Sequence, residues 1–217
     1  MSTEAHRSIA WAGLGLGVLL LILQASITIP ARMAEGGGIF FALVFYFSFF
    51  TILTNTGLVL VYAAVLSGRP RLRFMAGPTF RTMMAGAILL VMIVYAVLLA
   101  PIWNPQGLER LTDLGLHYLA PTLYLLWWLA GPHPVRLRYS RAAVMMIYPL
   151  GYCVWIISRG LTIERWPYPF VDVPQIGWGP VLLNMSGFAV LFVLVYLIAI
   201  ALVRRLHARA RFGHLRG

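Results

Sequence analysis

Long apolar runs follow one another along most of the 217-residue chain and are separated by short polar segments. A helix that crosses a membrane needs roughly 20 apolar residues, and several of the runs reach that length. The pattern predicts an all-α, polytopic membrane protein that forms one six-helix domain over residues 1–217. The predicted spans cover residues 8–29, 39–66, 80–100, 112–130, 142–158 and 179–203.

The composition agrees with this pattern. Hydrophobic residues make up 61% of the chain and the mean hydropathy is +0.84, whereas soluble domains are typically about 45–50% apolar. The first apolar run is too long for a cleaved signal peptide, and no clear cleavage site precedes Pro30. The single cysteine, Cys153, cannot form an intrachain disulfide. No internal repeat points to the paired halves of many transporters, and the six spans leave no room for a soluble domain.

The charged residues predict the orientation of the bundle. The net charge is +11. The chain has 17 arginines and no lysine. Thirteen of them lie at the two ends of the chain and in the second and fourth connections, and four lie on the opposite side. Because cytoplasmic segments carry the excess of basic residues, both termini are expected in the cytoplasm. The charge is expected to contact anionic lipid headgroups, and no nucleic acid partner is expected.

Several polar side chains interrupt the second predicted span. In the stretch FSFFTILTNTG, Ser48, Thr51 and Asn55 have the spacing of one helix face, with Thr54 beside them. Such a stripe can hold helices together, because Ser and Thr bond back to their own helix and Asn can bond to a neighbouring one. It can also line a site between helices. The spacing alone leaves both interpretations open.

The fourth predicted span contains a histidine and an aspartate. His117 is the only histidine inside a predicted span, and Asp113 precedes it by four residues, so both project from one helix face. An acidic partner can fix the tautomer of an imidazole, and ionisable groups at membrane depth are candidates for function. Asp113 lies near the end of the span, however, and could instead cap the helix or be solvated. The pair is therefore a candidate site with a structural alternative.

An aromatic connection at residues 158–179 joins the fifth and sixth spans. It contains Tyr168, Phe170, two tryptophans and three prolines. Aromatic side chains are typical of the membrane interface, and a stiff aromatic segment could equally cover a pocket. Arg159 stands where the fifth span ends, and it could bind a carboxylate or phosphate or extend toward lipid headgroups.

Several chemistries have no support in the sequence. A Gly-rich phosphate-binding loop followed by lysine is excluded because the chain contains no lysine. One histidine within the spans cannot ligate haem from both sides, and no cluster has the spacing of a zinc site. The G-x-S-x-G motif of many hydrolases is missing as well. We therefore predict neither a metal nor a cofactor.

Four motifs together resemble a known family. The motifs FFTILTN, WNPQG…D…LHYLAP, YPLGY and RWPYPFVDV occur in this order between the second and the sixth span. They resemble motifs of bacterial six-helix membrane proteins related to the androgen-induced and androgen-dependent membrane hydrolases of animals. The bacterial motifs match closely over nearly the whole chain, and the match to the animal enzymes is thinner. The resemblance implies an integral protein of the bacterial plasma (inner) membrane.

The resemblance also implies an activity. The animal enzymes are described as intramembrane threonine hydrolases that cleave fatty acid esters of hydroxy fatty acids (FAHFA) with a threonine and a histidine. Their threonine falls on Thr51 and their histidine on His117. Their Tyr-Pro-Phe loop falls on Tyr168, Pro169 and Phe170. Asp113 and Arg159 match the bacterial pattern. The animal enzymes have no acidic residue in the place of Asp113.

A mechanism follows as a hypothesis. Thr51 attacks the ester carbonyl while His117 accepts its proton and later activates water. The expected partners are membrane lipids and a lipid-like ester substrate. The residues that could orient the histidine or stabilise the oxyanion are Asp113, Asn55 and Asn184, and the candidates for substrate binding are Arg159, Tyr168, Phe170 and Thr54.

Two other hypotheses remain open. The protein could be a non-enzymatic binder or carrier of a lipid or small molecule, with a polar pocket between the second and fourth spans. It could also be a purely structural membrane subunit. The distance between Thr51 and His117 separates the hydrolase from the carrier, because hydrogen-bond reach favours the hydrolase and a gap above roughly 6 Å favours the carrier. A structural subunit predicts no enclosed cavity between the second and fourth spans.

Overall fold

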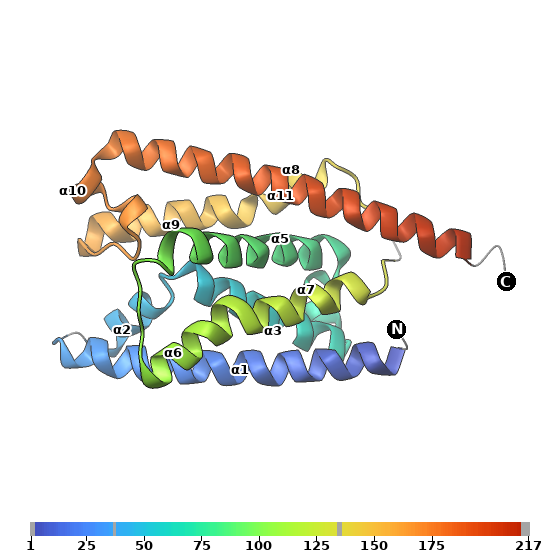
Figure 1. The fold of residues 1–217 in the computed structure, drawn as a ribbon, viewed down its shortest axis with the longest axis horizontal. Coiled ribbons are helices and arrows are strands. Elements are labelled where there is room, and N and C mark those ends of the chain that lie inside the picture. The colour runs from blue at the N-terminus through green and yellow to red at the C-terminus, as the bar shows by residue number, and fades with distance from the viewer. Residues whose placement is uncertain (1–2, 37, 134–135, 214–217) are drawn as a thin grey trace. The chain divides into compact units, whose positions relative to one another are not determined.

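The computed structural model describes residues 3–36, 38–133 and 136–213, and all regular elements within these ranges are helical (Figure 1). His214 and Arg216 of the predicted cytoplasmic tail lie outside the described residues. The chain divides into two compact units, Met1–Val135 and Arg136–Gly217. Within the described ranges, five helices are long and apolar enough to cross a membrane, which agrees with an α-helical membrane protein: Thr3–Ala34, Phe50–Ser67, Pro78–Leu99, Arg141–Ile163 and Trp178–Ala208.

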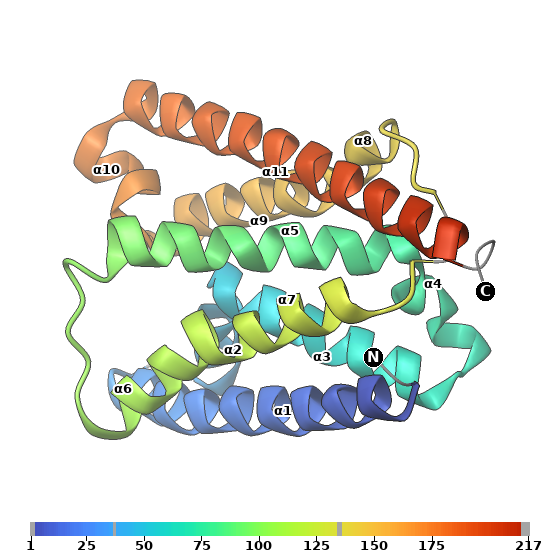
Figure 2. The same ribbon diagram turned by 45° about the vertical axis from the view of Figure 1, so that its right-hand side comes forward.

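The first unit packs a set of shorter helices along one long helix (Figure 2). The long helix, α1, contacts α2, α3, α6 and α7, and α3 and α7 also contact α5. Two of the elements, η2 and η3, are π-helical turns that continue the preceding helix. The elements in chain order are α1 (Thr3–Ala34), α2 (Ile39–Tyr46), α3 (Phe50–Ser67), η1 (Pro70–Leu72), α4 (Arg73–Ala76), α5 (Pro78–Val94), η2 (Tyr95–Leu99), α6 (Gly107–Leu114), η3 (Gly115–Leu119) and α7 (Ala120–Ala130).

The second predicted span, residues 39–66, is two helices instead of one. Helix α2 ends before Ser48, and α3 begins at Phe50. The Ser48 hydroxyl donates to the carbonyl four residues earlier at 2.5 Å, and the backbone of Phe49 is extended with φ −86° and ψ 126°. Thr54 and Thr56 make the same kind of bond inside α3 without interrupting it, so the break lies in the extended backbone at Phe49. As a result, Thr51 is the second residue of a helix rather than part of its middle.

The fourth predicted span, residues 112–130, is a helical run formed by α6, η3 and α7. It is not among the five apolar helices, and it carries Asp113 and His117. Pro121 has no N–H to donate to the carbonyl of His117, and its ring would clash with that carbonyl in a regular helix. This explains the π turn of η3, and η2 likewise ends shortly before Pro101. Such π turns are frequent at functional sites.

An apolar cluster fixes the start of α3 beside η3. Its members come from α1, α2, α3, η3 and α7, and burying a side chain such as leucine stabilises a fold by about 1.5–3 kcal/mol. Because the cluster spans all these elements, it holds the turns that carry Thr51 and His117 close together. The buried members are Leu20, Tyr46, Ile52, Leu116 and Ala120.

Two glycines let α1 pack closely against α3. A Cβ on Gly13 would lie 2.4 Å from Cζ of Tyr62, and a Cβ on Gly17 would lie 2.6 Å from Cγ2 of Val59. A Cβ on Gly15, on the other hand, would meet nothing within 4 Å. Small residues one turn apart allow two helix backbones to approach each other in a membrane. The pair therefore determines the spacing of α1 and α3.

We expect Gly13→Val to lower the melting temperature of the detergent-solubilised protein, because the new side chain would displace the buried ring of Tyr62. Overpacking of this kind typically costs about 1–3 kcal/mol. The matched control is Gly15→Val, which adds the same side chain to the same helix at an open position. Thermal unfolding followed by circular dichroism measures both, and equal melting temperatures would contradict the close packing of α1 on α3.

The second unit contains the fifth and sixth predicted spans. Residues 142–158 fall on α8 and α9, and residues 179–203 fall within α11. Pro149 removes a backbone donor near the start of α9, which explains the interruption at Met146. Prolines also begin the short helical turns η4 and α10 between the two spans. The elements are α8 (Arg141–Met145), α9 (Ile147–Ile163), η4 (Pro169–Val171), α10 (Val173–Ile176) and α11 (Trp178–Gly213).

Candidate active site

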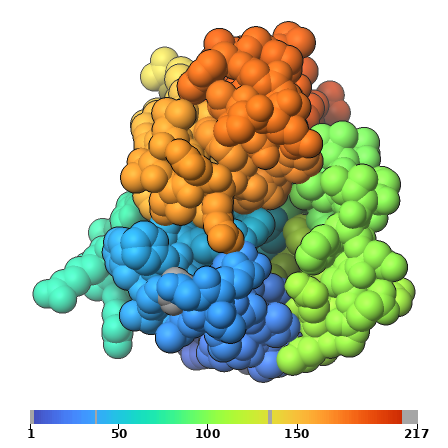
Figure 3. Space-filling model, turned by 90° about the vertical axis from the view of Figure 1, so that its left-hand side faces the viewer, coloured from blue at the N-terminus to red at the C-terminus, as the bar shows by residue number. Residues whose placement is uncertain are grey.

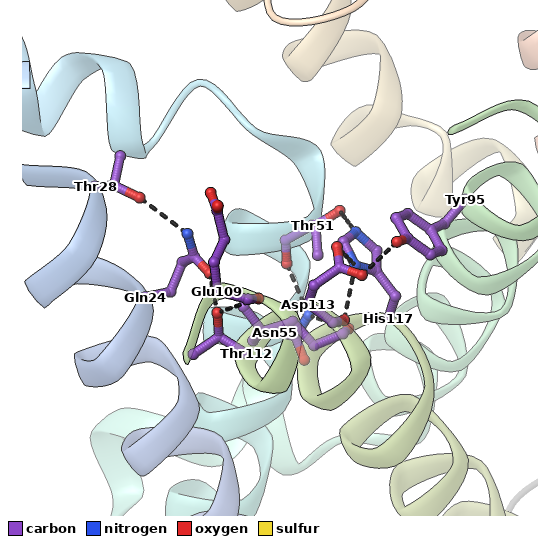
Figure 4. Close-up of polar contacts among 10 residues, drawn as sticks. Gln24, Thr28, Thr51, Asn55, Tyr95, Glu109, Thr112, Asp113 and His117 are labelled. Atoms are coloured by element: carbon purple, nitrogen blue, oxygen red, sulfur yellow. Dashed lines mark hydrogen bonds and ion pairs between the residues drawn. The ribbon is translucent and has the colours of Figure 1, made fainter. Parts of the chain in front are cut away.

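The fold brings Thr51 and His117 into contact although 66 positions separate them in the chain. Thr51 Oγ1 lies 3.2 Å from His117 Nε2, which is within hydrogen-bond reach. Thr51 belongs to the first turn of α3, and His117 is the central residue of η3 (Figure 4). Thr51 is 8% exposed and the side chain of His117 is 14% exposed. A hydroxyl and an imidazole therefore meet in a largely enclosed place.

The partners of His117 determine which of its ring nitrogens carries the hydrogen. Nδ1 faces two oxygens of Asp113, the carboxylate Oδ1 at 3.1 Å and the backbone carbonyl at 3.0 Å. Since both of these oxygens accept hydrogen bonds, we assign the hydrogen of the neutral imidazole to Nδ1. The lone pair of Nε2 then points at Thr51, whose hydroxyl donates to it. This tautomer is the one that a general base needs.

A tyrosine that the sequence analysis did not single out completes the surroundings of His117. The hydroxyl of Tyr95 donates to Oδ2 of Asp113. The ring of Tyr95 stacks on His117, with centroids 3.7 Å apart and planes 14° apart. Tyr95 begins η2, so the two π turns face each other at the site. A tyrosine in an apolar helix resembles any membrane-facing aromatic residue, and no spacing signal distinguishes it.

Asn55 connects the turn of Thr51 to the turn of His117. Its Nδ2 donates to the carbonyl of Thr51 at 2.9 Å and to the carbonyl of Leu116 at 3.1 Å, and its Oδ1 is buried without a hydrogen bond. The opposite orientation of the amide would place Oδ1 against two carbonyl oxygens. For Asn55 to serve as the predicted oxyanion donor, one of these two bonds would have to break.

We expect Asn55→Ala to destabilise the protein, because it leaves two buried carbonyl groups without their donor. An unsatisfied buried polar group typically costs about 1–3 kcal/mol. Thr56→Val is a suitable control, because the Thr56 hydroxyl donates to the carbonyl of Ile52 in its own helix, at 2.8 Å. The melting temperature in detergent should fall for the Asn55 variant and stay near that of the unmodified protein for the control. The reverse order would contradict the bridging role of Asn55.

The remaining hydroxyls of the polar stripe bond within their own chain segment. Ser48, Thr54 and Thr56 each donate to the carbonyl four residues earlier, at 2.5, 2.7 and 2.8 Å. Thr54, which was a candidate for substrate contact, is fully buried. These three bonds are local to the chain segment of each hydroxyl, whereas the Thr51 hydroxyl contacts a side chain of another helical segment.

A second polar network joins α1 to α6 next to the site (Figure 4). Thr112 donates to Oε1 of Gln24 at 2.5 Å, and Nε2 of Gln24 donates to Thr28 at 2.9 Å. Buried groups that satisfy one another hold membrane helices together. We interpret this network as an anchor for α6, in which Asp113 directly follows Thr112. The network was not predicted, because Gln24 is a single polar residue in a long apolar run.

Four predicted site residues lie in the second unit. Arg159 on α9 is buried and donates to the carbonyl of Arg165. Tyr168 stacks on Phe170 with centroids 5.0 Å apart, and Nδ2 of Asn184 on α11 donates to the carbonyl of Phe170 at 2.9 Å. The aromatic connection is therefore bonded to α11. The amide of Asn184, a second oxyanion candidate, is engaged in this contact.

The described residues contain no group of three or more His, Cys, Asp or Glu side chains that could hold a metal ion. The chain matches no protein-family model, no curated protein and no solved structure with which it was compared. The contacts of Thr51 and His117 are therefore the basis for a functional assignment.

Proposed function

We propose that this protein is an intramembrane hydrolase that cleaves a lipid ester, with Thr51 as the nucleophile and His117 as the general base. The observation that supports this most directly is the 3.2 Å contact between Thr51 Oγ1 and His117 Nε2, with Nδ1 held by Asp113. A hydroxyl is a weak nucleophile until a neighbouring base takes its proton. The order of nucleophile, base and orienting acid follows the logic of the serine triad, which is recognised by geometry.

The proposed reaction has two steps. In the first, Thr51 Oγ1 forms a bond to the ester carbonyl carbon while its proton moves to Nε2 of His117, and the ester C–O bond breaks as the leaving alkoxide takes that proton. In the second, water attacks the acyl-threonine while Nε2 accepts a proton from it. The bond to Thr51 then breaks, the threonine oxygen regains a proton, and a carboxylic acid leaves. Asp113 stays a hydrogen-bond acceptor for Nδ1 throughout.

The start of α3 supplies donors for the oxyanion in this proposal. The first backbone hydrogen bond of the helix runs from the N–H of Leu53 to the carbonyl of Phe49 at 3.2 Å. The N–H groups of Thr51 and Ile52 precede it, and the first N–H groups of a helix have no acceptor within the helix. The positive end of the helix dipole adds to their effect on negative charge. Donors of this type are typically worth roughly 3–4 kcal/mol in the transition state.

The substrate that we propose is a fatty acid ester of a hydroxy fatty acid or a similar lipid ester. Figure 3 shows the light-blue surface of α2 and the green surface around residues 100–110 on one face of the first unit. These two segments adjoin the turns of Thr51 and Tyr95 in the chain. They expose large apolar side chains, which suit contact with acyl chains. The exposed residues are Phe40, Phe41, Ile102 and Trp103.

We also propose a topology of six spans with both termini in the cytoplasm, in the bacterial plasma membrane. The sixth span would be the polar run of α6, η3 and α7, added to the five apolar helices. With six spans, thirteen of the 17 arginines fall on the side of the termini, as the positive-inside rule requires. The resemblance to the bacterial relatives of the androgen-induced and androgen-dependent hydrolases supports the same topology.

A carrier without catalytic activity is the alternative. It would explain the buried polar groups equally well, but it does not require the lone pair of Nε2 to point at the threonine hydroxyl. A separation above roughly 6 Å between Thr51 and His117 would have favoured a carrier. Thr51 Oγ1 and His117 Nε2 lie much closer, at 3.2 Å. The geometry therefore favours the hydrolase.

The experiment that separates the two functions follows the fate of a synthetic FAHFA in lipid nanodiscs that contain the purified protein. A hydrolase releases the fatty acid and the hydroxy fatty acid in equal amounts, and mass spectrometry quantifies both. A second arm uses a simple long-chain ester, which tests whether a branched substrate is required. Recovery of the bound ester intact, with neither product formed in either arm, would favour the carrier.

A further inference from the structure

We propose that Tyr95 is a positioning residue that locks Asp113 and His117 in the geometry that Thr51 requires. The catalytic meaning of this lock rests on the proposed function, whereas the lock itself is a property of the resting protein. Asp113 and His117 come from the same helical run, and Thr51 comes from α3. Tyr95 belongs to neither segment and is 5% exposed. It therefore joins a third helical segment to the site.

The hydroxyl of Tyr95 fixes the rotation of the Asp113 carboxylate. One carboxylate oxygen, Oδ1, faces Nδ1 of His117 at 3.1 Å, and the other, Oδ2, accepts the hydrogen bond of Tyr95. With both oxygens engaged, the carboxylate cannot turn without losing a bond. The terminal torsion of an aspartate is otherwise broad. The hydroxyl thus keeps the charged acceptor opposite Nδ1, beside the backbone carbonyl of Asp113 at 3.0 Å, and strengthens the preference for the tautomer in which Nε2 is free to take a proton.

The ring of Tyr95 fixes the plane of the imidazole. The two rings lie nearly parallel, with centroids 3.7 Å and planes 14° apart. Tyr118, the residue after His117, contacts Tyr95 edge-on at 5.6 Å and 79°. Ring pairs of these types contribute about 0.5–1.5 kcal/mol beyond their buried area. A rotation that tilts the imidazole out of its present plane would move Nε2 away from Thr51 and would break the stack.

The two parts of this role can be tested separately. Tyr95→Phe removes the hydroxyl and keeps the ring, and Tyr95→Leu removes both. Tyr46→Phe is the matched control: Tyr46 has the same exposed fraction of 5%, lies in the same unit, and donates its hydroxyl to the carbonyl of Leu21 at 2.7 Å. Each of the two Phe variants therefore loses one buried tyrosine hydroxyl with a hydrogen-bond partner.

The first readout is ¹⁵N NMR of histidine in the labelled protein without substrate, with the signal of His117 assigned from its loss in His117→Ala. The unmodified protein and Tyr46→Phe should show a single neutral tautomer with the hydrogen on Nδ1. Tyr95→Phe should add the Nε2–H tautomer, and Tyr95→Leu should add more of it. Identical spectra for Tyr95→Phe, Tyr95→Leu and the unmodified protein would overturn the lock.

The second readout is turnover of the lipid ester. Loss of an outer partner of a histidine–carboxylate pair costs 10–100-fold at metal sites, and we expect kcat of Tyr95→Phe to fall by roughly 10-fold with KM unchanged. A fall that appears only in KM, or an equal fall in Tyr46→Phe, would contradict a positioning role. The NMR readout does not need turnover, so an inactive unmodified protein would refute the proposed function and still leave the lock testable.

Discussion

Thr51→Val is expected to reduce ester hydrolysis to the background rate while the protein stays folded. Valine has nearly the shape of threonine and replaces the hydroxyl with a methyl group, so the apolar packing around the start of α3 is retained. The variant leaves His117 and the N–H groups of the first helical turn in place. It therefore removes the nucleophile alone, which is the hydroxyl that lies 3.2 Å from Nε2 of His117.

Two companion variants make this result specific. Thr51→Ser keeps a hydroxyl at the same position and is expected to retain a measurable part of the turnover. Thr56→Val removes a hydroxyl from the same helix and should hydrolyse the ester as fast as the unmodified protein. Turnover is measured in nanodiscs from the release of free fatty acid. A Thr51→Val variant that hydrolyses the ester at the unmodified rate would rule out Thr51 as the nucleophile.

His117→Ala is the second variant with a large expected effect. General base help from a positioned side chain typically contributes about 10²–10⁴-fold, so kcat should fall by a factor in this range. Residues that act as a unit have effects that do not add. The double variant Thr51→Val/His117→Ala should therefore be no slower than Thr51→Val alone.

The control for this prediction is another histidine of the first unit. His6 stacks on Trp127 with centroids 4.8 Å apart and contacts its carbonyl at 3.2 Å. The variant His6→Ala should keep its turnover per folded molecule. If His117→Ala turned over the ester as fast as His6→Ala, the role of His117 as the base would be wrong.

The helices were predictable from the sequence, because apolar runs of spanning length dominate the chain. The break between α2 and α3 was not, since neither glycine nor proline occurs there and the apolar pattern carries no sign of the extended backbone at Phe49. This break matters for function. It converts Thr51 from a residue inside a helix into one beside the free N–H groups at a helix start.

The candidate site was predictable only in part. The pairing of Asp113 with His117 follows from their spacing of four residues. In the structure, Oδ1 of Asp113 lies 3.1 Å from Nδ1 of His117. The contact between Thr51 and His117 depends on the packing of different helices, which periodicity along one helix does not describe. Tyr95 and Gln24 gave no signal, because a lone aromatic or amide side chain in an apolar run is compatible with lipid exposure or packing. Their contacts depend on how separate helices pack against one another.

The central claim is that Thr51 is a nucleophile activated by His117, and covalent labelling tests it most directly. A long-chain alkyl fluorophosphonate is added to the protein in nanodiscs, and the modified residue is located by peptide mass spectrometry. We predict one phosphonylated residue, Thr51, with labelling that is abolished in Thr51→Val and strongly slowed in His117→Ala. Labelling that persists in Thr51→Val at the unmodified rate, or that maps to another residue, would contradict the account.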